Sequence, residues 1–177
     1  MSEPVIIEEY NPNWKIKYNK VKDKILEKIG EFVIAMEHIG STAIPGLSSK
    51  PIIDILIGLR SLDDAEKCIP KLIELEFEYI KEHEKIFPDR RFYRKPAKGL
   101  GKREFHIHMV EINSCFWKRQ ILFRDYLIKH PEELEEYEKL KRNLALKFKE
   151  NRQAYSDGKD EFVQKILKKA QKQLDHT

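Results

Sequence analysis

A short polar segment of this chain has the residue types that bind phosphate groups. Gly40, Ser41 and Thr42 follow a predicted strand at residues 32–39, and Lys50 lies ten residues after Gly40. Glycine allows a turn where a Cβ would obstruct a ligand, and hydroxyl and backbone N–H groups suit a phosphate or similar anion. Lys50 adds a positive charge. Such a turn is common in proteins that bind no phosphate, so these residues do not decide the function alone.

Asp54 interrupts the otherwise apolar segment 51–58. The β-branched residues of this segment predict a buried strand. A carboxylate in such a place is costly unless it is paired, hydrogen-bonded or bound to a metal. Two interpretations stay open: Asp54 serves a metal or catalytic site, or it pairs with an arginine to hold the fold.

Two histidines alternate on a later predicted strand, at residues 104–112. His106 and His108 are two positions apart, so both rings face the same side. If this strand lies beside that of Asp54, the three side chains converge. They are then candidate metal ligands for Zn²⁺ or another transition metal, and candidate catalytic acids and bases. The alternative is a hydrogen-bonded histidine pair in a polar cleft.

The remaining histidines and Glu111 are weaker candidates for the site. His38 is a candidate for the rim of the site because it directly precedes Gly40. We expect His83 and His130 to be ordinary surface or capping residues. Glu111 falls on the opposite strand face from His108, so it is a poor substitute for a missing ligand.

Several arginines could contact a phosphorylated ligand. Arg91 and Arg94 precede the histidine strand, and a guanidinium suits bidentate phosphate binding. Solvated loop positions are an equal alternative. Arg124 lies in a predicted helix, where it either pairs with a carboxylate of the sheet or contacts the ligand. The aromatic residues do not interleave with the basic stretch, and a glutamate-rich segment follows Pro131. Nucleic acid is therefore an improbable partner.

The hydrophobic periodicity predicts helices and strands that alternate early in the chain and a helical end. The predicted helices are residues 14–30, 61–75, 115–128, one from Pro131 through Phe148, and one around 162–170; the predicted strands are 32–39, 51–58, 77–80, 91–95 and 104–112. A turn is expected at Ser156, Asp157 and Gly158. A mixed sheet with helices before and after it is the simplest assembly.

Length and composition favour a single domain. The chain has 177 residues and a formal net charge of +4; one domain at 1–177 would have a sheet core at about 30–112 and a helical part at about 114–175. Cys68 and Cys115 are expected to be buried, reduced thiols. With no signal peptide and no apolar run of membrane-spanning length, we expect a cytoplasmic protein without membrane contact. A homodimer stays possible.

The run GSTAIPGLSSKPIIDI at residues 40–55 resembles the signature of the GrpB family, and FHIHMV and FRDYLIKHP follow in the same order. The resemblance covers nearly the whole chain. It implies an α/β (α+β) fold, a nucleotidyltransferase-like mixed β-sheet flanked by helices, with a C-terminal helical segment. In that superfamily a Gly-Ser element and alternating carboxylates hold a divalent metal against a nucleoside triphosphate. Gly40 and Ser41 match the first feature, and Asp54 matches the first carboxylate.

The chain departs from that pattern at Leu56, where the second carboxylate would fall. One aspartate cannot provide the clustered oxygen ligands of a two-metal site. Two functions remain: a protein that binds a nucleotide or other phosphorylated small molecule with a divalent metal (Mg or Zn), with transferase activity uncertain, or a non-catalytic accessory, regulatory or interaction domain. The resemblance supports the second because related domains occur fused to dephospho-CoA kinase.

Overall fold

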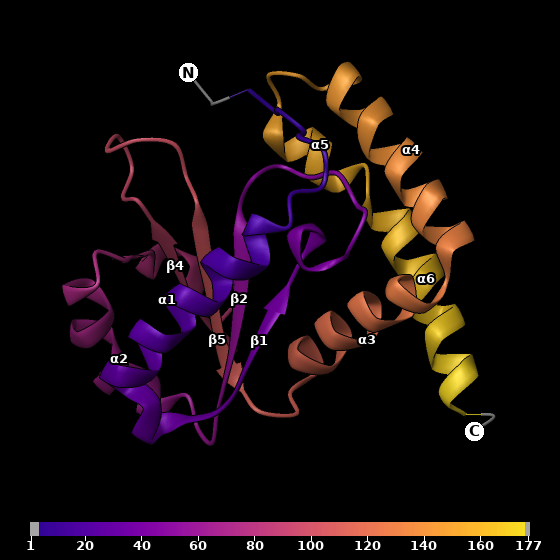
Figure 1. Ribbon diagram of the computed structural model, residues 1–177. Helices are drawn as coiled ribbons and strands as arrows, with labels where there is room; N and C mark the ends of the chain where they lie inside the picture. Colours follow the sequence, from indigo (N-terminus) through magenta and orange to yellow (C-terminus); the bar gives the residue numbers. More distant parts are fainter. Residues whose placement is uncertain (1–3, 176–177) are drawn as a thin grey trace.

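The computed structural model describes residues 4–175 and contains one five-stranded mixed sheet with helices on both faces (Figure 1). The strand order is β1-β2-β5-β4-β3; β2 and β5 are parallel, and the other neighbours are antiparallel. The strands are β1 (Val33–Ile39), β2 (Ile53–Leu59), β3 (Glu78–Tyr79), β4 (Arg90–Lys95) and β5 (Phe105–Glu111). The helices are α1 (Asn13–Ile29), α2 (Asp63–Glu74), α3 (Cys115–Lys129), α4 (Pro131–Lys147), α5 (Arg152–Asp157) and α6 (Asp160–Leu174).

One face of the sheet is an apolar surface covered by α1 and α2. Side chains alternate along a strand, so β2 directs Ile53, Ile55 and Ile57 to this face, where all three are buried. Ile107 and Met109 of β5 lie in the same cluster. Burial of this apolar area, at about 25 cal/mol per Å², stabilises the attachment of the two helices to the sheet.

The opposite face has an apolar part and a polar part. Leu56 packs against Val110 and against Trp117 of α3. Gly58 leaves room for that indole, since a Cβ there would lie 2.9 Å from Trp117 Cζ3. Asp54 shares this face but stands nearer the start of β2, outside the cluster around Trp117. The polar site therefore begins where this apolar cluster ends.

The C-terminal helices form a separate apolar cluster beside α3, on the side away from α1 and α2 (Figure 1). Leu127 of α3, Tyr137 of α4 and Ile166 of α6 are buried in it. Ile44 and Leu47 come from the loop between β1 and β2 and are fully buried in the same cluster. The loop that follows Gly40 is thus anchored to the C-terminal helices as well as to the sheet.

The predicted fold class is confirmed: the sheet is mixed, helices flank it, and the end of the chain is helical. Every predicted strand is present within a few residues. The prediction missed the short helix α5, where only a turn was expected at its end. It was also wrong for Cys115, which is exposed at the first position of α3, whereas Cys68 is buried as expected. Across residues 4–175, no helix combines the length and apolarity needed to cross a bilayer.

Candidate functional site

Asp54, His106 and His108 meet on the polar part of the sheet. Asp54 stands opposite His106 in the parallel register of β2 and β5. His106 Nδ1 lies 3.1 Å from Asp54 Oδ1, and His108 Nε2 lies 3.7 Å from the same oxygen. One ligand atom from each residue lies within 4.8 Å of the others, so the three form a group that could hold a metal ion. Their side chains are 26%, 18% and 17% exposed, which leaves them accessible from one side.

The second nitrogen of each ring has no such contact. His106 Nε2 and His108 Nδ1 are buried and have no hydrogen-bond partner among the residues described. Phe92 of β4 packs against both rings, with centroid distances of 5.1 Å to each. The two imidazoles are therefore held by apolar contacts on one side and present their other nitrogen to Asp54.

The electrostatic environment favours the metal-binding forms of these groups. Burial raises the pKa of the Asp54 carboxyl, but the hydrogen bonds and charge of His106 and His108 outweigh it and hold that pKa well below its usual range. Burial lowers the pKa of His108, and Asp54 only partly offsets this. At neutral pH Asp54 is a carboxylate and His108 a neutral imidazole, the states that can coordinate a metal.

Gly40 brings the loop after β1 directly against this group. Its φ is 70°, a conformation that favours glycine. A Cβ at this position would collide with Asp54 Oδ2 and lie 3.2 Å from Asp54 Cγ. Two independent features therefore favour glycine at position 40: its backbone conformation and its close approach to the Asp54 carboxylate. The next residues form the 3-10 helix η2 (Ser41–Ala43), whose first residue lines the cleft.

The cleft over Asp54 has a volume of about 440 Å³ and lies between the sheet and the C-terminal helices. This volume falls within the range of small-molecule sites. Its sheet side contains Gly40, Ser41, Ser49, Lys50, Ile52, Asp54, Phe92, His106 and His108, and its helical side contains Arg119, Gln120, Phe123, Tyr137, Tyr155, Ser156, Lys159, Val163 and Leu167. The site is therefore made by two parts of the chain that are distant in sequence.

Thr42, a predicted phosphate ligand, is buried and hydrogen-bonded within the protein. Its hydroxyl lies 3.2 Å from the Ile52 carbonyl, to which it donates, and accepts from His38 Nε2 at 3.0 Å. His38 faces α1, where its ring stacks on Tyr18 with a centroid distance of 4.7 Å. Burial lowers the pKa of His38 to about 4. The structure therefore places Thr42 and His38 in the support of the loop and not on the surface of the cleft.

The predicted arginines Arg91 and Arg94 lie outside the cleft lining. Arg91 faces α2, with Nε 3.3 Å from Glu66 Oε1. Arg94 makes two hydrogen bonds to Glu78, at 2.6 and 2.8 Å. Both guanidinium groups therefore pair with carboxylates of the protein, although the sequence suggested that they would bind phosphate.

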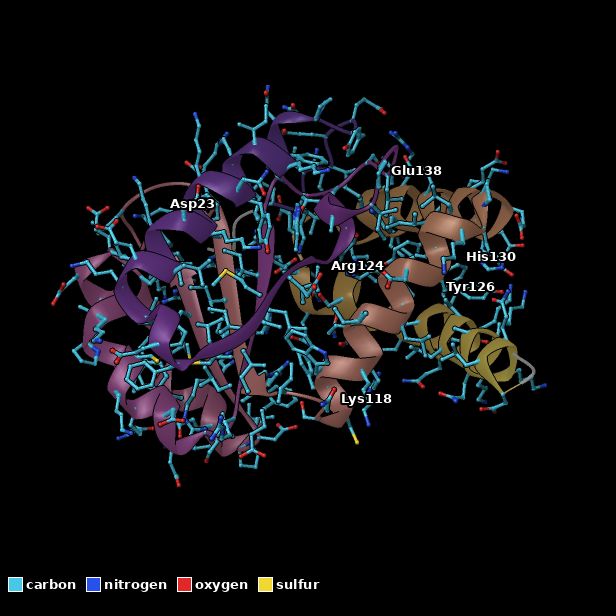
Figure 2. All side chains as sticks on the ribbon, turned by 60° about the horizontal axis from the view of Figure 1, so that its bottom comes forward. Asp23, Lys118, Arg124, Tyr126, His130 and Glu138 are labelled. Carbon is cyan, nitrogen blue, oxygen red and sulfur yellow. The ribbon has the colours of Figure 1, made fainter. Side chains whose placement is uncertain are left out.

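Arg124 also has a structural position. Figure 2 shows it on α3 beside the sheet, and its Nη1 donates to Glu37 at 2.7 Å and to the His38 carbonyl at 2.9 Å. Its Nε lies 2.7 Å from Asp125 Oδ1. The first of the two roles considered for Arg124, an ion pair between helix and sheet, matches these contacts.

Tyr126 and His130, labelled in the same figure, lie on the helical side of the molecule. Their rings stack on each other with a centroid distance of 3.8 Å.

Sequence reasoning missed several residues of the cleft. His83 lies on the 3-10 helix η3 (Lys81–Lys85) and lines the cleft, stacked on Phe92 at a centroid distance of 4.4 Å. The expectation of an ordinary surface position was wrong for His83. Tyr155 and Lys159 come from the α5–α6 region, where the sequence indicated only a turn. The juxtaposition of lysine and tyrosine beside a Ser-Asp-Gly turn was a usable but weak signal.

The positions of Leu56 and Glu111 explain why the site has no second carboxylate. Leu56 is fully buried in the apolar cluster under α3. Glu111 lies on the α2 side, where its Oε1 accepts from the Leu62 backbone N–H at 3.2 Å. Among residues 4–175, Asp54 is thus joined by two imidazoles and by no second carboxylate in the group that could hold a metal.

Most of the chain is similar to one group of bacterial proteins. The sequence model of the family described as GrpB protein matches residues 4–169. The "Glutamate-rich protein GrpB" of Alkalihalophilus pseudofirmus is 37% identical over 92% of this chain and 94% of that protein. A crystal structure of conserved protein GrpB from Enterococcus faecalis has a TM-score of 0.85 and 30% identity, over 96% of this chain and 99% of that chain.

Two weaker similarities concern named enzymes. A dephospho-CoA kinase of Mycolicibacterium paratuberculosis is 24% identical over 98% of this chain and 48% of its own length. The Cid1 poly(U) polymerase bound to MgATP gives a TM-score of 0.46 at 15% identity, over 78% of this chain and 41% of that chain. The second likeness is too low to bear on activity.

Proposed function

The chain belongs to the GrpB family, and we propose that it binds a phosphorylated small molecule of the nucleotide class together with one divalent metal ion. The observation that supports this most directly is the convergence of Asp54, His106 and His108 in an accessible cleft. These polar groups lie on strands whose other face buries Ile53, Ile55, Ile57, Ile107 and Met109. A fold that needed only stability could place apolar residues there at lower cost.

The ligand set favours a transition metal such as Zn²⁺ over Mg²⁺. Mg²⁺ prefers a near-octahedral shell of oxygen atoms, whereas two histidines and a carboxylate with an open fourth position are typical of catalytic zinc. Ligand atoms that share a tetrahedral zinc at about 2.1 Å are roughly 3.4 Å apart. The separations of 3.1 and 3.7 Å from Asp54 Oδ1 to the two imidazole nitrogens lie on either side of that value.

The phosphate group would lie against the loop at Gly40 and Ser41. These residues line the cleft next to Asp54, and the hydroxyl and backbone N–H groups of such a turn suit a phosphate. Lys50 adds positive charge to the same wall. A metal held by Asp54, His106 and His108 would supply Lewis-acid chemistry in the same cleft.

The proposal is limited to one metal ion. Phosphoryl transfer by two metals needs clustered carboxylates, and the face that holds Asp54 has the buried Leu56 in place of the second. The function proposed is therefore ligand binding with single-metal Lewis-acid chemistry, and no two-metal nucleotidyl transfer is proposed.

A zinc titration of chelator-treated protein by isothermal calorimetry tests the metal. We expect one zinc ion per chain for the wild type and a loss of at least about 100-fold in affinity for Asp54→Asn, since a ligand is removed. Asp64→Asn is the matched control: its side chain is 27% exposed, close to the 26% of Asp54, and lies on α2. Unchanged zinc affinity in Asp54→Asn, or an equal loss in Asp64→Asn, would refute the site.

A melting-temperature screen tests the nucleotide. Each of the four nucleoside triphosphates, at about millimolar concentration with the metal, should be compared with metal alone. Binding to the folded state raises stability by about 2.7 kcal/mol at 100 times the Kd, which is a shift of several degrees. No shift with any triphosphate would contradict a nucleotide ligand, whatever the metal result.

A non-catalytic accessory role is the second candidate. Leu56 in place of a carboxylate favours it, as does the similarity to a portion of a dephospho-CoA kinase. In that case Asp54→Asn would leave the binding of a partner protein unchanged while abolishing zinc binding. Loss of both together would favour the ligand-binding role.

A further inference from the structure

Two lysines that line the cleft, one from each of its sides, lie against the same aromatic ring. Lys50 precedes β2, and Lys159 is the residue before the first turn of α6. Their Nζ atoms lie 5.1 Å and 4.6 Å from the centroid of the Tyr155 ring, which is itself buried. All three residues line the same cleft as Asp54. Both amines thus contact one buried ring, and the charge of Lys159 acts on Lys50.

Neither lysine forms an ion pair within residues 4–175. Other lysines of this chain do so: Lys95 pairs with Glu76, and Lys165, which follows on α6, pairs with Glu136 at 2.8 Å. The carboxylates of Asp54 and Asp160 only partly offset the burial of Lys159. The lysine pair is therefore an excess of positive charge in a partly enclosed place.

The pKa of each amine lies below its usual value. Burial, followed by repulsion from Lys159 and Arg152, lowers the pKa of Lys50 to about 8. Burial likewise lowers the pKa of Lys159. Bringing two like charges out of water is unfavourable, and an anion between them would reverse the penalty. The arrangement resembles a binding site more than a stabilising contact.

We propose that Lys50, Lys159 and Tyr155 form a second anion subsite, and that the ligand carries a diphosphate or longer phosphate chain. This inference rests on the proposed function, since it assigns the first phosphate to the loop at Gly40. A monophosphate would occupy only one of the two positions. Gly40, Lys50 and Lys159 line one cleft of about 440 Å³, and a diphosphate is the shortest phosphate chain with one group for each position.

Calorimetric titration of chelator-treated protein with inorganic phosphate and with pyrophosphate tests the subsite without the metal. We expect pyrophosphate to bind at least about tenfold more tightly, the usual gain from one more charge-assisted contact. Lys159→Met should reduce this preference to near unity, and Lys50→Met should weaken both probes. Lys165→Met, on the same helix but paired with Glu136, should leave both affinities unchanged.

Melting temperature separates binding from structure. Methionine keeps much of the apolar stem of lysine, so removing an unpaired, partly buried charge should leave the ligand-free melting temperature unchanged or raise it. A clear fall in Lys159→Met would assign the lysine to structure and overturn the subsite. Equal affinity of the wild type for phosphate and pyrophosphate would overturn it as well.

The outcome is distinguishable from failure of the proposed function. Zinc binding, measured on the same variants, should be unaffected by Lys159→Met because Asp54, His106 and His108 are unchanged. If zinc binds and pyrophosphate shows no preference, the second subsite is wrong and the metal site stands. If pyrophosphate is preferred and zinc does not bind, the second subsite stands and the metal site is wrong.

Discussion

The two faces of strands β2 and β5 differ in what their side chains accomplish. On the α1 and α2 side, Ile55 and Ile107 stand opposite each other in the register and are fully buried. One residue earlier, Asp54 and His106 face the cleft and are partly exposed. The same backbone thus supports a packed core on one side and a polar group on the other. Residues of opposite parity on the same strands therefore contribute to the packed core and to the candidate site.

The largest expected effect comes from the apolar face. Ile55→Ala should lower the free energy of unfolding by about 2–5 kcal/mol, because it removes buried methyl groups and leaves a cavity. Urea unfolding measures the loss, and a zinc titration of the folded variant should give wild-type affinity. A loss below about 1 kcal/mol would mean that this face is not tightly packed, and an altered zinc affinity would show that the two faces are coupled.

Glycine substitutions sharpen the comparison where the loop meets the polar face. Gly40→Ala should destabilise the protein by about 1–3 kcal/mol and weaken zinc binding, since the new Cβ combines a strained φ with displacement of Asp54. Gly46→Ala is the control: its φ is 81°, but nothing lies within 4 Å of an added Cβ. It should cost about 1 kcal/mol and leave zinc affinity unchanged.

Unfolding midpoints and zinc titrations on both glycine variants show whether the contact between Gly40 and Asp54 affects zinc binding. If Gly46→Ala impaired zinc binding as much as Gly40→Ala, backbone strain in the loop would explain the effect. The close approach of Gly40 to the carboxylate would then have no special role.

The smallest effect concerns acid stability. The pKa of Asp54 is held below its usual range by His106 and His108, so the unfolded chain takes up this proton at higher pH than the folded protein. The stability from Asp54 is present above about pH 4 and is lost as the pH falls below that value. Asp54→Asn should remove this part of the acid dependence, on the order of 1–2 kcal/mol, the scale of a hydrogen bond to a charged group.

Urea unfolding between about pH 6 and pH 3 measures this dependence. The difference in unfolding free energy between wild type and Asp54→Asn should shrink as the solution becomes more acidic. A difference that stays constant over this range would show that the histidines do not stabilise the carboxylate.

The sheet part of the site could be predicted from the sequence because strand geometry is local. Two histidines separated by one residue must face the same side, and Asp54 in an apolar run marks a polar position on a strand. Placing these strands side by side needed the family resemblance as well. The parallel register of β2 and β5 then brings the three residues together.

The helical part of the site could not be predicted in the same way. Tyr137, Tyr155 and Lys159 reach the cleft because of how α4, α5 and α6 pack against the loop and α3, and local periodicity does not encode that arrangement. The arginines were predicted to bind phosphate but lie elsewhere. A guanidinium group suits phosphate, yet Arg94 and Arg124 pair with carboxylates on neighbouring elements. Such pairing depends on tertiary contacts, which the local sequence does not reveal.

Crystals of chelator-treated protein, soaked with zinc and measured at the zinc absorption edge, test whether Asp54, His106 and His108 form a metal site. We expect one anomalous peak per chain, at about 2.0–2.2 Å from an Asp54 oxygen, His106 Nδ1 and His108 Nε2. The peak should disappear in Asp54→Asn. No peak between these three residues in the wild type, with both histidine rings still facing the aspartate, would rule out the metal site.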